Sequence, residues 1–300
     1  MANIILYQTG NKSRDPKSGL YYDPWDSHIW FCIEQIRKWN QKIDIYMITD
    51  DCVVSNEDNF IKFNIKREYT YELVTKYDVE NTPYFSTSIN PSERACGLRP
   101  FYTESIMTKY NLTNSYLFDN DVLIYCDLED LSNKLSLLYD RVAVTASSKD
   151  LMVLGMCYIK DHKSFSDITE LLWELMNSDI GRNLLDMGLW NLIHQQKGKS
   201  FVDVLPTWGD GLFSENSETI GGIFDPSSIG QFLLGCDNGN PPGTFFPHHY
   251  IHNRLKENNY EFTFNYDDSK KYISVFNKST SMSHKVLSIH VHNKKLKLLM

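Results

Sequence analysis

The sequence contains, at residues 116–125, the stretch Tyr116-Leu117-Phe118-Asp119-Asn120-Asp121-Val122-Leu123-Ile124-Tyr125. Apolar runs of this kind form the buried strands of parallel sheets, but this run is interrupted by two carboxylates. Burying the charge of a carboxylate beside such a strand costs free energy unless an opposite charge neutralises it. A divalent cation can do so, because hard cations bind carboxylate oxygens. Residues two apart on an extended chain point the same way, so Asp119 and Asp121 can hold one ion.

Other interpretations of this Asp-x-Asp triplet fit less well. The apolar flanks argue against a solvated surface turn. An EF-hand loop needs an oxygen ligand and then a glycine where this chain has Leu123 and Ile124. A phosphatase of the haloacid dehalogenase type would use Asp119 as nucleophile and Asp121 as acid. That type usually has Thr or Val at position 123 and places its nucleophile near the start of the fold, so we keep it as an alternative.

Composition limits the class of protein. Three hundred residues suffice for one large domain, and a net charge of −8 argues against general nucleic-acid binding. No C-x-x-C pair occurs among the six cysteines, which argues against a zinc site and for buried thiols in a reducing compartment. We find no signal peptide and no apolar run of the roughly twenty residues that span a membrane, so we expect a cytoplasmic protein.

The N-terminal fifty residues predict a β-α-β unit. Asn3–Tyr7 and Ile43–Ile48 are apolar strands, and a helix that starts at Asp26 or Ser27 lies between them. Such units form parallel sheets, in which ligands bind beyond the carboxyl ends of the strands. The candidate binding residues at these ends are Thr9, Gly10 and Asp50.

The rest of the chain continues to alternate between strands and helices. We expect a strand at 60–65 and a helix at 100–110, with Arg94 and Arg99 just before that helix and suited to phosphate oxygens. Later helices are predicted at 127–139, 164–176 and 184–196, and later strands at 141–146, 152–159 and 201–205. The Gly- and Pro-rich stretch 208–247 is long enough to be a functional loop; within it, Trp208 can stack on a sugar, and Asp225 is either a helix cap or a catalytic residue.

Taken in order, these motifs resemble those of GT-A glycosyltransferases. The stretch 117–124 is similar to the metal-binding D-x-D strand of that fold, and residues 5–10, 34–40 and 45–50 are similar to its nucleotide-binding half. Ile289-His290-Val291-His292-Asn293-Lys294 resembles the late strand of glycogenin-like retaining enzymes, and 185–191 with Val204-Leu205-Pro206 resembles their acidic helix and the strand after it. The chain departs from that group at Met187 and in Leu154-Gly155-Met156, and its spacing from His to Lys is shorter.

The resemblance implies roles for individual residues. Asp119 and Asp121 would bind the metal, His290 or His292 would complete its coordination, and imidazole favours Mn²⁺ over Mg²⁺ or Ca²⁺. His290 is our first choice, although both histidines lie on one strand face. The expected contacts to the donor nucleotide come from Asp119, Asn120 and Lys294, whereas Asp186 would lie beside the acceptor or the reacting carbon.

The resemblance also implies the whole architecture and activity. We expect a single α/β domain of GT-A type, with a mostly parallel central sheet, a nucleotide-binding half at 1–126 and an acceptor-side half at 127–300. The implied reaction is metal-dependent and of the retaining type, and it moves a sugar from a UDP-sugar to a glycan, protein or lipid-linked acceptor. Alternatives are the phosphatase, a sugar nucleotidyltransferase and a non-catalytic nucleotide- or glycan-binding relative. The basic, apolar tail 294–300 could form a terminal helix or touch a membrane surface weakly.

Overall fold

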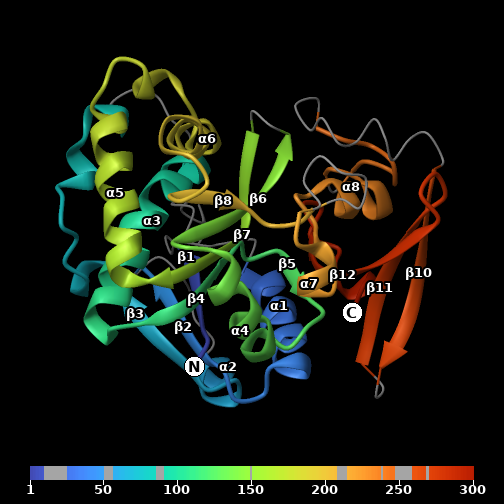
Figure 1. Ribbon diagram of the computed structural model, residues 1–300. Helices are drawn as coiled ribbons and strands as arrows, with labels where there is room; N and C mark the ends of the chain where they lie inside the picture. The colour runs from blue at the N-terminus through green and yellow to red at the C-terminus, as the bar shows by residue number, and fades with distance from the viewer. Residues whose placement is uncertain are drawn as a thin grey trace.

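The computed structural model describes residues 1–9, 26–50, 57–85, 91–148, 151–207, 215–237, 239–246, 259–267 and 270–300. Gly10 and Trp208, both predicted to bind ligand, lie outside these residues. Two sheets lie next to each other, and helices cover both faces of the larger one (Figure 1). Among the described residues, no helix is both long enough and apolar enough to cross a membrane.

The larger sheet is mostly parallel. Its first strand pairs in parallel with the second and the fourth, as the β-α-β prediction requires, and β7 is the strand that runs antiparallel to both of its neighbours. The predicted fold class, an α/β protein with a mostly parallel central sheet flanked by helices, is therefore confirmed. In spatial order the strands are β3 (Ile65–Tyr69), β2 (Asp44–Thr49), β1 (Asn3–Gln8), β4 (Thr113–Phe118), β7 (Leu151–Asp161), β6 (Val142–Ser148) and β8 (Val202–Val204).

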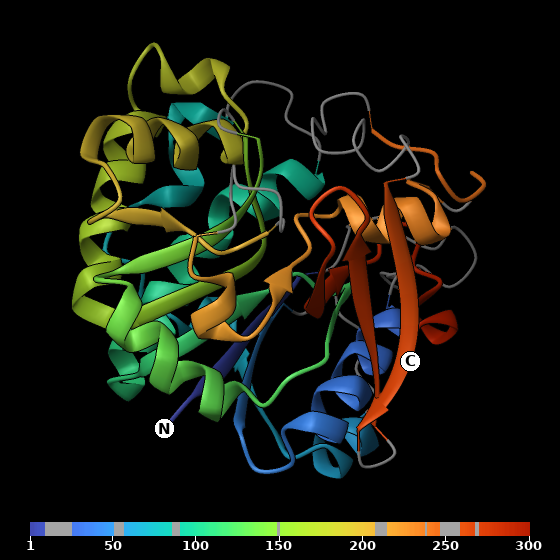
Figure 2. The same cartoon turned by 45° about the vertical axis from the view of Figure 1, so that its right-hand side comes forward.

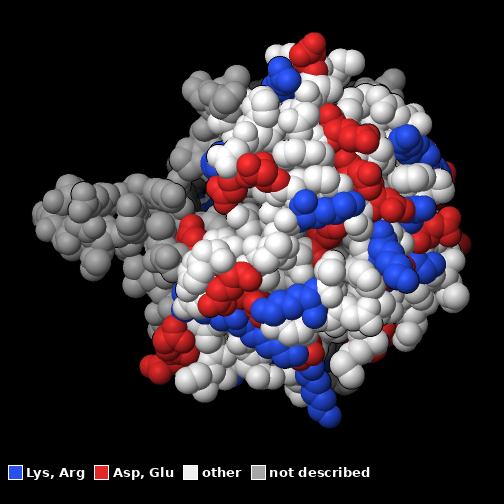
Figure 3. Space-filling view, turned by 90° about the vertical axis from the view of Figure 1, so that its left-hand side faces the viewer, with Lys and Arg blue, Asp and Glu red and all other residues white. Residues whose placement is uncertain are grey.

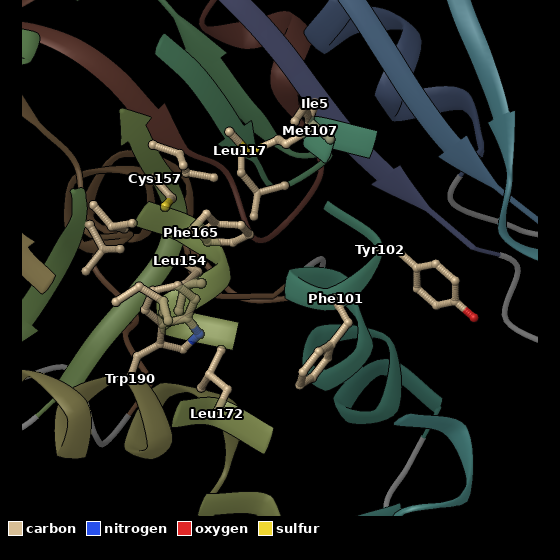
Figure 4. Packing of buried hydrophobic residues seen from close by; sticks show 14 of the residues in the cluster. Ile5, Phe101, Tyr102, Met107, Leu117, Leu154, Cys157, Phe165, Leu172 and Trp190 are labelled. Atoms are coloured by element: carbon tan, nitrogen blue, oxygen red, sulfur yellow. The ribbon is translucent and has the colours of Figure 1, made fainter. Parts of the chain in front are cut away.

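Alternating side chains of this sheet build a core on each face. Ile5 and Leu117 point to one side, where they pack with helix residues such as Phe101 and Trp190 (Figure 4). Ile4 and Phe118 point to the other side, as the period of two along a strand requires. The first core is covered by α3 (Pro91–Tyr110), α5 (His162–Met176) and α6 (Asp186–Lys197), and the second by α1 (Asp26–Trp39), α2 (Glu57–Lys62) and α4 (Leu128–Leu138).

The smaller sheet carries the C-terminal part of the chain. It is antiparallel along its main path, and α8 and the C-terminal residues pack with it and with α1 in a third core (Figure 2). Its strands are β10 (Tyr260–Asp267), β11 (Lys270–Asn277), β12 (Met282–His290) and β5 (Val122–Ile124), with β9 (Ile223–Phe224) parallel to β12. The short helices beside it are α7 (Ser217–Ile220), α8 (Ser228–Leu234) and the 3-10 helix η5 (Leu296–Leu298), which stands where a terminal helix was expected.

The quoted stretch at 116–125 is not one strand. Its first part ends β4 of the larger sheet, and its last part is β5 of the smaller sheet. Between them the chain turns at Asp119-Asn120-Asp121, where the amide of Val122 donates to the carbonyl of Asp119 (3.2 Å). Because β5 pairs with β12, which lies near the end of the chain, local sequence could not reveal this change of sheet. The carboxylates therefore lie at the junction of the two sheets.

Two other element predictions need correction. The predicted strand at 60–65 is wrong, because α2 occupies its first half and β3 begins only at Ile65. Glu57 and Asp58 in the first turn and Lys62 in the last turn suit the dipole of this short helix. The helix predicted at 100–110 begins earlier, at Pro91, and includes Pro100 in its interior. By contrast, α4, α5 and β7 lie where the sequence predicts them.

Candidate functional site

Three candidate metal ligands meet at the junction of the sheets. Antiparallel pairing of β12 with β5 places His290 opposite Val122, next to Asp121. His290 Nε2 lies 3.0 Å from Asp121 Oδ1, and the rings of His290 and His292 stack with their centroids 4.2 Å apart. One ligand atom from each of Asp121, His290 and His292 lies within 4.8 Å of the others. Both histidines thus belong to the group, although the sequence suggested one of the two.

The position of His290 depends on two further residues. A Cβ on Gly155 of β7 would lie 2.5 Å from His290 Nδ1, so only glycine lets the imidazole approach this strand. The buried carboxylate of Asp225 accepts hydrogen bonds from the backbone amides of His290 (3.1 Å), Ile229 (2.8 Å) and Gly230 (2.8 Å). Asp225 therefore joins the end of β12 to the first turn of α8. Of the two roles predicted for Asp225, this geometry matches the helix-capping one.

Asp121 is an ionised carboxylate that is shielded from solvent. It is only 2% exposed, and burial by itself would raise its pKa. His290 and Lys294, which forms an ion pair with Asp121, outweigh burial and bring the pKa of this carboxyl well below its usual range. One carboxylate and two imidazoles form a donor set of the kind that binds divalent transition metals, so the residues fit the expected Mn²⁺.

The carboxylate of Asp119 has a cationic partner on α3. Its carboxylate forms an ion pair with Arg99, which is 5% exposed, and its Oδ2 lies 3.7 Å from His290 Nε2. Asp119 is therefore beside the group of three ligands rather than one of its members. The side-chain amide of Asn120 donates to Gln8 Oε1 at the end of β1. Sequence reasoning did not select Gln8, although it lies at the carboxyl end of a parallel strand.

Asp186 lies at the first position of α6 and faces the same cluster of charges. Burial raises its pKa, and the Arg99 guanidinium opposes that rise. The thiol of Cys96 on α3 lies in the same environment, because burial and then Asp186 raise its pKa to about 11 while Arg99 lowers it. Arg99 therefore interacts with both Asp119 and Asp186. Nothing in the sequence pattern had marked Cys96.

The remaining predicted nucleotide contacts lie near Tyr7. Burial raises the pKa of Tyr7, and the charges of Tyr102, Glu80 and Asp50 raise it further, while a hydrogen bond with Thr9 lowers it. Thr9 and Asp50 thus lie at one edge of the larger sheet, as predicted from the carboxyl ends of their strands.

The Arg94 side chain contacts an acidic and an aromatic side chain of the protein. Its guanidinium bonds to the Glu80 carboxylate (2.8 Å) and lies 4.8 Å from the centroid of the Phe85 ring. The same Glu80 also accepts the hydroxyl of Tyr102 (2.7 Å). Arg94 therefore links α3 to the segment that carries Glu80, and Arg99 is the better placed of the two predicted phosphate-binding arginines.

No protein-family model and no curated protein matches the chain. Several solved structures do match. Mouse xyloside xylosyltransferase 1 gives a TM-score of 0.47 at 7% identity, covering 73% of this chain and 92% of its own. GlyE of Streptococcus pneumoniae gives a TM-score of 0.43 at 14% identity, and the match covers 77% of this chain and 47% of GlyE. The galactosyltransferase LgtC, in complex with donor and acceptor sugar analogues, gives a TM-score of 0.43 at 15% identity, and the match covers 68% of this chain and 73% of LgtC.

The matched structures also include nucleotidylyltransferases from Bacillus anthracis and Leptospira borgpetersenii.

Proposed function

We propose that this protein is a metal-dependent glycosyltransferase that uses a nucleoside-diphosphate sugar. The observation that supports this most directly is the convergence of Asp121, His290 and His292 at one buried point between the two sheets. Cationic and acidic side chains surround this point. Arg99 and Lys294 are the cations, and Asp186 is the carboxyl group on the acceptor side.

Each of these side chains has a task in such a reaction. Asp121, His290 and His292 would hold Mn²⁺, which when bound neutralises charge that gathers on a departing diphosphate. Arg99 and Lys294 supply further positive charge for phosphate oxygens, and their present ion pairs with Asp119 and Asp121 bring that charge to the site. The cost of separating those pairs would be offset by the new contacts with phosphate.

Asp186 is the candidate group for the acceptor. Its raised pKa makes it a better proton acceptor than an ordinary carboxylate, and its place at the start of α6 is fixed by backbone contacts. It can therefore accept a hydrogen bond from an acceptor hydroxyl. UDP as the nucleotide, and retention of the anomeric configuration, are parts of the proposal that rest on the sequence resemblance.

The test is calorimetric titration of UDP, GDP, CDP and dTDP into the protein, each with and without Mn²⁺. We expect one nucleotide to bind, and its affinity to fall at least tenfold without Mn²⁺ or in Asp121→Asn. The matched control is Asp130→Asn, because Asp130 is an exposed carboxylate on α4. Sugar conjugates of the nucleotide that binds would then be tested for hydrolysis and transfer, and NMR of the product would give its anomeric configuration.

Two results would contradict the proposal. One is the absence of binding by any of the four nucleotides in the presence of Mn²⁺. The other is turnover of p-nitrophenyl phosphate that requires Asp119, which is the result expected of the phosphatase alternative.

A further inference from the structure

A second charged feature lies away from the ligand group, on the smaller sheet and the elements next to it. We call it the lysine surface, and it consists of Lys38 on α1, Lys270 and Lys271 on β11, Lys285 on β12 and Lys297 on η5. In Figure 1 and Figure 2 the C-terminus lies beside β11 and β12, close to α1. The surface is thus assembled from three parts of the chain that are far apart in sequence.

Two of these lysines share an aromatic contact, and a third bonds to the tail that carries Lys297. Lys270 Nζ and Lys285 Nζ lie 5.0 and 4.7 Å from the centroid of the Trp39 ring. Lys271 Nζ donates to the main-chain oxygens of Leu298 (3.5 Å) and Met300 (3.3 Å). Burial lowers the pKa of Lys271, and the positive charge of Lys38 lowers it further.

Acidic side chains do not neutralise the lysine surface within the described part of the chain. None of the five lysines forms an ion pair with a described acidic side chain, whereas others such as Lys66 and Lys278 do. Glu34, one turn before Lys38 on α1, is an acidic neighbour of this surface, and the acidic residue Asp267 lies opposite Lys270 in the register of β10 and β11. The opposite situation holds on the face that carries α5, where basic and acidic side chains are interspersed (Figure 3) and Arg141 pairs with Asp167. These five lysines thus differ from the ion-paired lysines of the described chain, whose full sequence has a net charge of −8.

Apolar side chains are exposed among these lysines. Leu298 is 61% exposed and Phe264 is 43% exposed, and Lys271 contacts the Phe264 ring and the Leu298 carbonyl. Tyr266, on the same strand as Phe264, is 71% exposed. Lysines that flank exposed aromatic and aliphatic groups are typical of surfaces that lie at the boundary between lipid headgroups and acyl chains.

We propose that the lysine surface binds the surface of an anionic phospholipid bilayer. Lipid phosphates would neutralise the lysines, and Leu298, Phe264 and Tyr266 would enter the headgroup region. A nucleic acid fits less well, because bases need open ring faces, and lysines already cover Trp39, which is only 8% exposed. The proposal enlarges the membrane contact expected from the tail, and it does not depend on the proposed enzymatic function.

The test is sedimentation of the whole protein with vesicles of phosphatidylcholine alone and with vesicles in which phosphatidylglycerol replaces roughly a third of it. We expect binding to the anionic vesicles only, weakened by salt. Replacing Lys270, Lys271 and Lys297 by Gln should weaken it roughly a hundredfold, at about fivefold per lysine. The control triple, Lys163→Gln, Lys197→Gln and Lys199→Gln, removes the same charge elsewhere and should bind like the wild type.

Leu298→Asn tests the apolar part separately and should weaken binding while leaving the charge unchanged. Circular dichroism and thermal unfolding of each variant establish that it is folded. Equal losses in the two triples, or no binding of wild-type protein to anionic vesicles, would overturn the proposal. Binding to heparin without binding to anionic vesicles would overturn it in favour of an anionic polymer.

Discussion

At the scale of single residues, the ligand group depends on small features that no motif describes. The clearest is Gly155, because its missing side chain makes room for the His290 imidazole. The sequence marks this glycine only as a departure from a family pattern. Its importance follows from a contact between β7 and β12, which are brought together by the fold.

Gly155→Ala should displace His290 and weaken Mn²⁺ binding about 10- to 100-fold, the range found when the surroundings of metal ligands are changed. The measurement is calorimetric titration of Mn²⁺ at constant pH. Gly239→Ala is the matched control, because a Cβ there would meet no atom within 4 Å. Unchanged affinity in Gly155→Ala would show that His290 does not need this close approach.

The raised pKa of Asp225 predicts that the stability of the protein depends on pH. Burial raises its pKa to about 6, so the native state binds its proton more tightly than the unfolded chain does. The stabilisation is present below the ordinary carboxyl pKa and is lost as the pH rises through about 6. From the shift, we expect a loss on the order of 3 kcal/mol between pH 4 and pH 7.

Urea unfolding at pH 4, 5, 6 and 7 measures this effect, with Asp225→Asn lacking the titrating group. The difference in unfolding free energy between wild type and variant should change most as the pH rises from 4 to 7. Asp130→Asn, which removes an exposed carboxyl group on α4, is the control for this comparison. A constant difference for Asp225→Asn would contradict the raised pKa.

At the scale of elements, helix α4 is a part of the fold that local sequence describes fully. Asp127 caps it by accepting the amides of Glu129 (2.9 Å) and Asp130 (3.1 Å). Asp127→Ala should therefore cost about 1 kcal/mol of unfolding free energy. Urea unfolding measures this cost, and Asp140→Ala, at an exposed position after the same helix, is the control that should change stability far less. Mn²⁺ affinity should stay the same in both variants, since neither residue touches the ligand group.

The elements also show how far sequence reasoning reaches. Helices α4 and α5 and strand β7 were predicted because apolar spacing and segment length are local properties. The division of 116–125 between two sheets was missed, because it depends on pairing of β5 with the distant β12.

The same reasoning applies to the candidate site. Asp121, His290 and His292 were selected from the sequence, and the structure brings them together. Asp119 was expected among the ligands, but its nearest opposite charge is Arg99. Gln8, Gly155 and the backbone contacts of Asp225 could not be selected, because each acts through a neighbour that is remote in sequence.

At the scale of the whole molecule, ligand binding should raise the free energy of unfolding. A ligand that binds only the native state at a hundred times its Kd adds about 2.7 kcal/mol. For a chain of this size, that corresponds to a rise in Tm of roughly 4 °C. We expect this rise with Mn²⁺ and the nucleotide that binds, measured by differential scanning calorimetry. Asp130→Asn should keep the rise, whereas a rise that persists in Asp121→Asn would place the binding elsewhere.

The turn at 119–121 has a mechanical consequence for the molecule. It is covalently continuous with β4 on one side and β5 on the other, and His290 joins it from the end of β12. An ion held there would brace the two sheets at this junction, in addition to the core that β5, β9 and β12 share with the larger sheet. Local opening of the smaller sheet would then require release of the ion. Amide hydrogens of β11 and β12 should therefore exchange more slowly when Mn²⁺ is present, while those of β2 and β3 should keep their rates.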